Sequence, residues 1–176
     1  LFCALNCVTT NFSKNAVISY IKSGFTNLTS VEAGNLENYI LSTGICKTSF
    51  ISGKYFKYLP YMSKGIDEKE FLDDINKTIQ KAANPLIKLK NSLDSAEDFK
   101  SKCRALYDFA IEISLYEKIE STILRIEKNT LQTAAYYSQV WNTFINTLDE
   151  ISDVLGDSQC TSAEFCEMLS VALSIH

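Results

Sequence analysis

Lysines and aromatic residues alternate along one segment of the chain, and these are the residue types that could do chemistry. No acidic residue occurs between Glu37 and Asp67. Lysine side chains neutralise phosphates, and aromatic rings stack on unpaired bases. The aromatic residues of the segment are Phe50, Tyr55, Phe56, Tyr58 and Tyr61. We therefore predict a contact for DNA or for a partner protein, with the candidate residues Lys47, Lys54, Tyr55, Lys57, Tyr58 and Lys64.

The same segment also fits a structural role, which the sequence favours. In that interpretation the aromatic side chains attach the loop to the rest of the protein, and the lysines keep its outer side in water. The two arginines, Arg104 and Arg125, both lie outside the segment. Bidentate recognition of a base or a phosphate by arginine is therefore not expected there.

Charge is distributed unevenly along the chain. Residues 1–66 hold six lysines against two acidic residues, a net charge of +4, whereas residues 67–176 hold 19 acidic against 11 basic residues, a net charge of −8. Because acidic surfaces repel phosphate, any contact with nucleic acid is expected in the first third of the chain.

Helical patterns fill the first half of the chain around this segment. Lys14 to Ser23 is expected to form a short helix with Val17, Ile18 and Ile21 inward, ended by a left-handed Gly24. Thr29 and Glu32 predict a capping box, followed by an apolar face of Val31, Leu36, Tyr39 and Ile40 up to Gly44. A helix opened by Asp67 and lined by Phe71, Ile75 and Ile79 is expected to break or kink at Pro85.

The second half shows three further helical patterns. Ser95 with Asp98 is expected to cap a long helix with Phe99, Cys103, Leu106, Ala110 and Ile113 inward, and a shifted stripe of Tyr116, Ile119, Ile123 and Ile126 extends it toward Asn129. The next helix covers about 131–155, with an inward seam of Trp141, Phe144, Leu148, Ile151 and Leu155, and ends at Gly156-Asp157. Thr161 and Glu164 cap the last one, which turns Phe165, Met168, Leu169 and Ala172 inward.

The fold class predicted from these patterns is all-α. No segment of any length alternates apolar and polar residues as a half-buried strand would. Gly53, Pro60 and Gly65 interrupt the helical pattern between Cys46 and Ile66, so this stretch is expected to be an irregular aromatic loop. We predict a single domain over residues 1–176, built as a bundle of about six helices.

The chain lacks the motifs of the common catalytic sites. It has no glycine-rich Lys-Ser/Thr loop for a nucleotide, no Gly-x-Ser-x-Gly motif and no Cys-x-x-Cys pair, and its one histidine is His176. The acidic pairs Asp73-Asp74, Glu97-Asp98 and Asp149-Glu150 are interpreted as solvated helix faces. We therefore expect no catalytic residue, bound cofactor or metal site in this chain.

The cysteine content leaves two interpretations open. The six cysteines are Cys3, Cys7, Cys46, Cys103, Cys160 and Cys166. Reduced thiols in a cytoplasmic protein are favoured, but the even count and three formal glycosylation sequons, at Asn11, Asn27 and Asn76, also fit a secreted helical effector with three disulfides. No apolar run approaches the roughly 20 residues that span a bilayer, so no membrane contact is expected.

Two short motifs resemble a known family. The first motif lies in residues 17–45, and its residues, which fit a structural role, are Tyr20, Lys22, Gly24, Leu36, Glu37, Asn38, Tyr39 and Gly44. The second includes Trp141, Leu148-Asp149, residues 154–157 and residues 165–169. Together they resemble the B subunit of AddAB-type (RexAB-type) ATP-dependent helicase-nucleases over residues 12–45 and 137–176. Between these two stretches the resemblance lies in helical character.

The resemblance implies a place for this chain within a larger protein. It is similar to the helical insertion, comparable to the 2B subdomain of superfamily 1 helicases, that interrupts a motor domain, so we expect an excised piece. The implied parent is a cytoplasmic bacterial hydrolase that repairs double-strand DNA breaks for recombination with an A subunit. Its ATP and magnesium sites and its iron–sulfur cluster are implied to lie elsewhere. An unrelated cytoplasmic protein-interaction bundle remains a further alternative.

Overall fold

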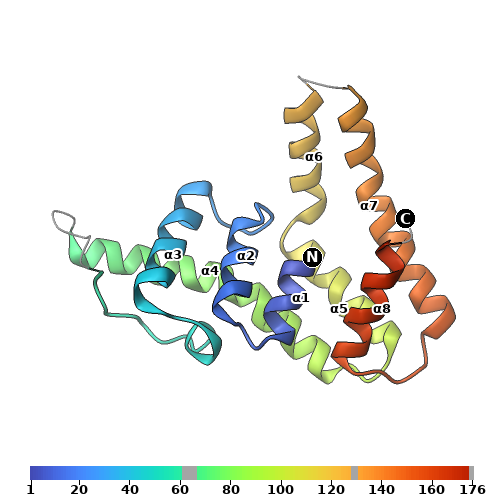
Figure 1. Ribbon diagram of the computed structural model, residues 1–176, viewed down its shortest axis with the longest axis horizontal. Helices are drawn as coiled ribbons and strands as arrows, with labels where there is room; N and C mark the ends of the chain where they lie inside the picture. The colour runs from blue at the N-terminus through green and yellow to red at the C-terminus, as the bar shows by residue number, and fades with distance from the viewer. Residues whose placement is uncertain (61–66, 128–130, 175–176) are drawn as a thin grey trace. The chain divides into compact units, whose positions relative to one another are not determined.

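The fold is all-α, as predicted (Figure 1). The computed structural model describes the backbone of residues 1–60, 67–127 and 131–174. Within these ranges there is no β-strand, and the helices are α1 (Phe2–Thr9), α2 (Lys14–Lys22), α3 (Ser30–Thr43), the 3-10 helix η1 (Lys47–Ser49), α4 (Glu68–Ser95), α5 (Phe99–Glu112), α6 (Leu115–Glu127), α7 (Leu131–Leu155) and α8 (Ser162–Ser174). The described part of the chain therefore has eight α-helices, two more than expected.

Backbone proximity divides the chain into two compact units, residues 1–88 and residues 89–176. Helix α4 contributes residues to both units. Each unit has its own buried apolar residues, among them Leu36 and Phe50 in the first and Leu106 and Phe165 in the second. The single domain over residues 1–176 stays a prediction.

In the first unit, local signals start and stop the helices as the sequence indicates. The Ser13 hydroxyl accepts a hydrogen bond from the Ala16 N–H at the start of α2. The Thr29–Glu32 capping box forms at the start of α3, and Gly44 ends that helix with φ +72°. Gly24 also has a positive φ, +76°, as predicted. Helix α1 was not predicted, and its N-terminus has no side-chain cap that could have indicated it.

In the second unit, the loop between α4 and α5 pairs with the loop between α7 and α8. Asp98 and Gln159 form an isolated antiparallel bridge, and the Cys160 N–H donates to the Glu97 carbonyl at 2.9 Å. Phe99 lies against Phe165, with ring centroids 6.4 Å apart. The predicted capping box of Thr161 and Glu164 is confirmed at the start of α8.

Two predicted boundaries in the second half of the chain are wrong. Ser95 does not cap the helix that follows, because it is the last residue of α4, and the N-cap of α5 is Asp98, whose carboxylate accepts from the Ser101 N–H at 2.7 Å. The predicted continuous helix from about residue 99 to 129 is interrupted after Glu112. The interruption is at Ser114, whose φ of +51° is incompatible with a right-handed helix.

Of the two outcomes predicted at Pro85, the break does not occur, because α4 runs through this residue from Glu68 to Ser95, and the kink stays a prediction. A proline inside a helix costs about 3 kcal/mol through a lost hydrogen bond and a steric clash. On this face α4 buries Ala82, Ala83, Leu86 and Leu89. Burying a leucine side chain contributes about 1.5–3 kcal/mol, so the apolar face outweighs the cost of the proline.

Most predicted inward faces are confirmed, with exceptions at their edges. Phe99, Cys103, Leu106, Ala110 and Ile113 are all buried, as are Phe144, Leu148 and Ile151. Val31 was expected to be buried but is 72% exposed. It precedes the buried Leu36 by five positions, so its side chain points about 140° away from that of Leu36 around the axis of α3. The expected inward residues Tyr116 and Met168 are also exposed.

Candidate functional site

The basic and aromatic segment begins at an anchored turn. Residues 46–60 contain no regular secondary structure except η1, which agrees with the predicted loop over the described residues. The Lys47 N–H donates to the Phe12 carbonyl at 2.6 Å, and Lys47 has a φ of +55°. The Phe50 ring is fully buried. The start of the segment is therefore held against the first unit while the Lys47 side chain stays exposed.

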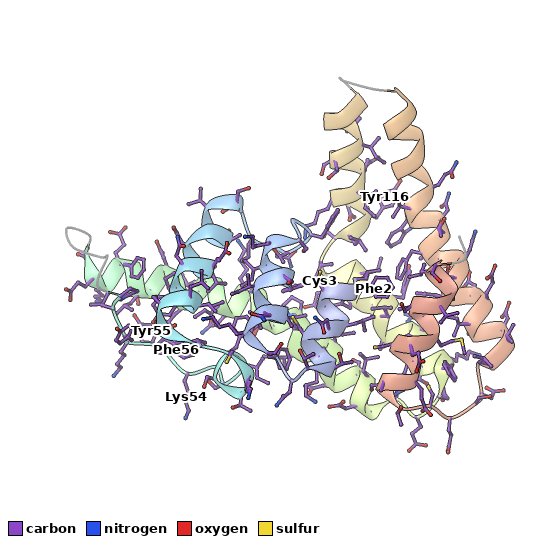
Figure 2. The ribbon with its side chains drawn as sticks, in the orientation of Figure 1. Phe2, Cys3, Lys54, Tyr55, Phe56 and Tyr116 are labelled. Atoms are coloured by element: carbon purple, nitrogen blue, oxygen red, sulfur yellow. The ribbon has the colours of Figure 1, made fainter. Side chains whose placement is uncertain are left out.

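Asn76 of α4 holds the middle of the segment. Its side chain is 96% buried, the carboxamide oxygen accepts from the Phe56 N–H at 2.7 Å, and the carboxamide nitrogen donates to the Phe56 carbonyl at 2.9 Å. The same nitrogen donates to the Leu72 carbonyl at 2.7 Å. A buried amide therefore fixes both backbone polar groups of one loop residue. Figure 2 marks this stretch at Lys54, Tyr55 and Phe56.

Two tyrosine hydroxyls fix the segment on either side of Phe56. The Tyr55 hydroxyl donates to the Asp73 carboxylate at 2.6 Å, and this hydrogen bond raises the pKa of Tyr55 above its ordinary value. The Tyr39 hydroxyl donates to the Tyr58 carbonyl at 2.9 Å, and burial raises the pKa of Tyr39. Both phenols therefore stay protonated and uncharged at neutral pH.

An open groove of about 620 Å³ lies between the end of α3 and this segment. Its lining residues are Ser42, Thr43, Ile45, Lys54, Tyr55, Phe56, Lys57 and Tyr58. Lys54 and Lys57 are exposed, and the Tyr55 and Tyr58 side chains are 47% and 61% exposed. The lining thus combines two cations, two outward aromatic rings and two hydroxyls, without a carboxylate.

The structure brings four of the six predicted contact residues together. Lys54, Tyr55, Lys57 and Tyr58 line the groove, whereas Lys47 belongs to the same segment but not to the lining. Lys64 and the aromatic residue Tyr61 lie outside the described residues. The aromatic residues differ in burial, because Phe50 is buried, Phe56 is half-buried in the groove lining and the two tyrosines are exposed. A contact of these residues with DNA or a partner stays a prediction.

The motif residues of the first unit mostly support α2 and α3. Lys22 and Glu37 form an ion pair at 3.0 Å between the two helices. Tyr20, Leu36 and Tyr39 are buried, and Gly24 and Gly44 supply the left-handed turns described above. Asn38 is exposed on α3.

Sequence reasoning missed the residues that support the groove. Asp73 was interpreted as part of a solvated acidic pair, and Asn76 as the first residue of a glycosylation sequon. Instead, each accepts a hydrogen bond from the loop, Asp73 from the Tyr55 hydroxyl and Asn76 from the Phe56 N–H. One signal pointed to Asn76, because helical spacing places this polar residue on the apolar face between Leu72 and Ile79. Glu32 was also missed as an ion-pair partner. It reaches Lys81 of α4 at 2.9 Å, and the pKa of Glu32 is lowered by the Thr29 N–H and then by Lys81.

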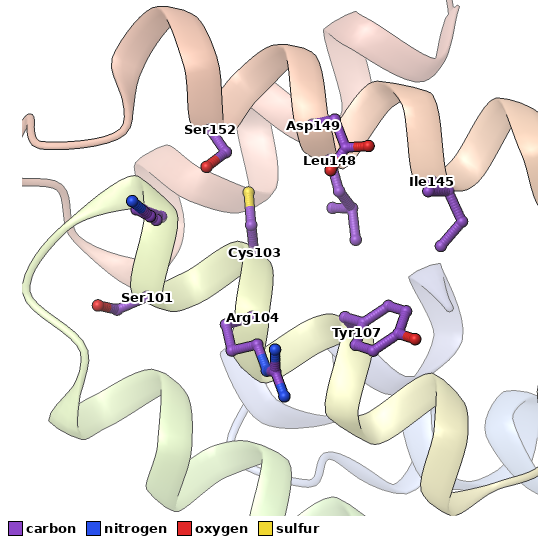
Figure 3. Close-up of a pocket in the computed structure, with 9 residues that line it drawn as sticks. Ser101, Cys103, Arg104, Tyr107, Ile145, Leu148, Asp149 and Ser152 are labelled. Carbon is purple, nitrogen blue, oxygen red and sulfur yellow. The ribbon is translucent and has the colours of Figure 1, made fainter.

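A second pocket, of about 730 Å³, lies between α5 and α7 (Figure 3). Arg104 and Tyr107 of α5 face Leu148 and Asp149 of α7 across it. The Arg104 guanidinium is paired with Asp108 at 3.0 Å, and burial raises the pKa of the Cys103 thiol to about 12. The Cys103 thiol therefore stays protonated at neutral pH.

Metal and disulfide chemistry have no support among the described residues. In residues 1–60, 67–127 and 131–174, no three His, Cys, Asp or Glu side chains gather as metal ligands. All six cysteines are free thiols. Within the same ranges, the helices are all too short or too polar to cross a bilayer.

Comparison with known proteins places nearly the whole chain within one kind of protein. The chain is 30% identical over 176 residues to the B subunit of the ATP-dependent helicase/deoxyribonuclease of Clostridium botulinum, and 32% identical over 178 residues to that of Clostridium kluyveri; each alignment covers 97% of the chain. The B subunit of the same enzyme from Acetivibrio thermocellus is 31% identical over 92% of the chain. No protein-family model matches.

These alignments confirm the resemblance found in the sequence motifs. The chain is homologous to one segment of the helicase/deoxyribonuclease B subunit. The alignments also include the middle of the chain, where the resemblance had been limited to helical character. The chain spans about 15% of the length of the curated relatives it matches. The relatives give no support to a secreted effector or to an unrelated bundle.

Proposed function

We propose that this chain is a non-catalytic helical subdomain of the B subunit of an ATP-dependent helicase-exonuclease, and that it positions DNA during double-strand break repair and recombination. The single observation that supports this role best is the alignment of 97% of the chain with the B subunit of a helicase/deoxyribonuclease. In this proposal the chain corresponds to a 2B-like insertion and acts in the cytoplasm.

The basic and aromatic segment is the proposed DNA contact. The exposed side chains of Lys47, Lys54 and Lys57 form no ion pair with the described residues, so they are available to phosphates. Residues 1–88 hold ten basic and seven acidic side chains, a net charge of +3, whereas residues 89–176 hold seven basic and 14 acidic side chains, a net charge of −7. Charge thus favours DNA binding at the first unit.

Other parts of the parent would perform the chemistry. The pockets described above contain neither a nucleotide-binding loop nor a nucleophile–base pair. We propose that ATP, magnesium and the iron–sulfur cluster are bound by other segments of the parent, which pairs with an A subunit. This chain would contribute by holding DNA or the partner protein in place, without contact to the reacting atoms.

The salt dependence of DNA binding tests this function. The 176-residue chain is titrated with labelled forked DNA at low and moderate salt, by fluorescence anisotropy. Replacing Lys47, Lys54, Lys57 and Lys64 by Ala should weaken binding and make it less sensitive to salt, because each lost phosphate contact lowers the slope of log affinity against log salt by about 0.7–0.9.

A matched control removes four lysines outside the segment, Lys14, Lys69, Lys77 and Lys100. This control keeps the same net charge as the first variant, so a purely non-specific effect of charge would weaken both equally. Unchanged binding in the first variant, or equal weakening in both, would contradict the proposed contact.

A further inference from the structure

The two outward tyrosines of the groove have exposed side chains although hydrogen bonds hold this part of the loop in place. Tyr55 and Tyr58 are large apolar side chains that remain 47% and 61% exposed. Hydrogen bonds nevertheless hold the Tyr55 side chain and the Tyr58 backbone, because the Tyr55 hydroxyl donates to the Asp73 carboxylate and the Tyr58 carbonyl accepts from the Tyr39 hydroxyl. Exposed aromatic rings on a fixed backbone are pre-organised for contact with a flat ligand.

The backbone between the two tyrosines adds to this pre-organisation. Phe56 lies between them, and the buried Asn76 side chain binds both its N–H and its carbonyl. Residues 54–60 contain no helix or turn, and five consecutive residues of this stretch, 54–58, line the groove. Lys54 and Lys57 each adjoin a tyrosine in the sequence, and all four residues line the same groove.

The groove is complementary to an anionic strand with accessible bases. Its lining contains Lys54 and Lys57 and no carboxylate, and the Asp73 carboxylate accepts a hydrogen bond from the Tyr55 hydroxyl. Ser42 and Thr43 complete the lining, and their hydroxyls donate to the Tyr39 carbonyl. Aromatic rings stack on the faces of bases, and those faces are hidden inside a duplex but available in a single strand.

We propose that this groove binds one unpaired DNA strand, with Tyr55 and Tyr58 stacking on bases and Lys54 and Lys57 contacting phosphates. The inference rests on the proposed function, because the relatives' name, deoxyribonuclease, is what selects DNA as the nucleic acid. It adds that the strand is unpaired and that the two tyrosines recognise it.

Replacement of the rings tests the inference in the 176-residue chain. Binding of labelled oligothymidine and of a blunt duplex of equal length is measured by anisotropy, with wild type, Tyr58→Leu and Tyr58→Phe. Stacking on one base contributes about 1–3 kcal/mol, so Tyr58→Leu should weaken single-strand binding about 5- to 150-fold. Tyr58→Phe keeps the ring and should bind within about twofold of wild type, as should duplex binding by Tyr58→Leu.

Two further variants serve as controls for this test. Tyr116→Leu removes a tyrosine of similar exposure, 46%, from the second unit and should leave binding unchanged. Tyr58→Trp preserves a stacking surface and supplies a signal, because its emission should fall when a base stacks on it. This signal remains informative if Tyr58→Leu fails to fold.

Failure of the inference and failure of the proposed function give different results. If wild type binds DNA and the four-lysine variant loses binding, but Tyr58→Leu binds the single strand like wild type, then the stacking inference is wrong and the DNA contact stands. Equal affinity of wild type for the duplex and the single strand would also overturn the inference. If wild type binds neither DNA at low salt, the proposed function fails and this inference fails with it.

Discussion

The two units of the chain use their polar side chains differently. In residues 89–176, even a lysine is turned inward: Lys102 is 98% buried, and its ammonium donates to the Leu93 carbonyl at 2.8 Å and the Ala96 carbonyl at 2.5 Å. In residues 1–88, Lys54 and Lys57 project into solvent beside exposed tyrosines. Lys102 stabilises a helix end, whereas Lys54 and Lys57 remain available to a ligand.

The same contrast separates structural from functional side chains within the first unit. Asn76 and Glu32 are bonded within the unit, to Phe56 and to Lys81. The groove lysines have no such partner among the described residues. Changes to the first kind should alter stability, and changes to the second should alter binding.

The strongest effect on stability is expected in the second unit, at Lys102. Lys102→Met keeps the apolar stem but leaves two carbonyls at the end of α4 without their charged donor. The free energy of unfolding should fall by about 2–3 kcal/mol, because hydrogen bonds to charged groups are worth more than neutral ones. Thermal unfolding followed by circular dichroism measures this, and Lys100→Met, at an exposed neighbour, should change it by less than about 0.5 kcal/mol. Unchanged stability in Lys102→Met would show that this lysine has no role in holding α4.

A smaller effect is expected at Asn76, where the groove is attached to α4. Asn76→Ala removes the amide that binds Phe56, at a cost of about 1–2 kcal/mol. The released segment should be cut faster by trypsin after Lys54 and Lys57, and single-strand binding should weaken although no groove side chain has changed. Asn38→Ala, at an exposed asparagine of α3, is the matched control and should change neither property. Wild-type cleavage rates in Asn76→Ala would argue against the attachment.

The weakest effect concerns the acid stability of the first unit. The Glu32 pKa is lowered from 4.5, so the folded state favours its charged form. This contribution is present above about pH 4.5 and is lost as the pH falls through the lowered pKa. Because the Glu32 side chain is still 30% exposed, solvent screens its charge. Glu32→Gln should therefore cost only about 0.5–1 kcal/mol at pH 7, and the difference from wild type should shrink toward pH 3.

Urea unfolding at several pH values measures this difference. Glu70→Gln is the control, since Glu70 lies on the exposed side of α4. A difference between wild type and Glu32→Gln that does not change with pH would mean that the Glu32 charge does not stabilise the capping box.

Local sequence signals predicted many of the helix ends, because a helix end is determined by interactions within a few residues. The capping boxes at Thr29 and Thr161, the left-handed Gly24 and the helix end at Gly44 are examples. The helix does not break at Pro85 because burial of the α4 face, a tertiary effect, outweighs the local penalty of the proline. The interruption at Ser114 had no glycine or proline to indicate it.

The candidate site was predictable in its composition but not in its geometry. Alternating lysines and aromatic residues were visible in the sequence, and four of them line one groove. The partners that shape it, Asp73 and Asn76, lie 18 and 20 residues along the chain from Tyr55 and Phe56. Helical periodicity places residues on a face of their own helix, but it does not pair that face with a distant loop.

Hydrogen exchange of the 176-residue chain, with and without saturating single-stranded DNA, would show whether the first unit is the part that binds DNA. We expect DNA to slow exchange in residues 42–60 and to leave the amides of α5, α7 and α8 unchanged. Slower exchange in the second unit with no change in residues 42–60 would contradict DNA binding at the groove.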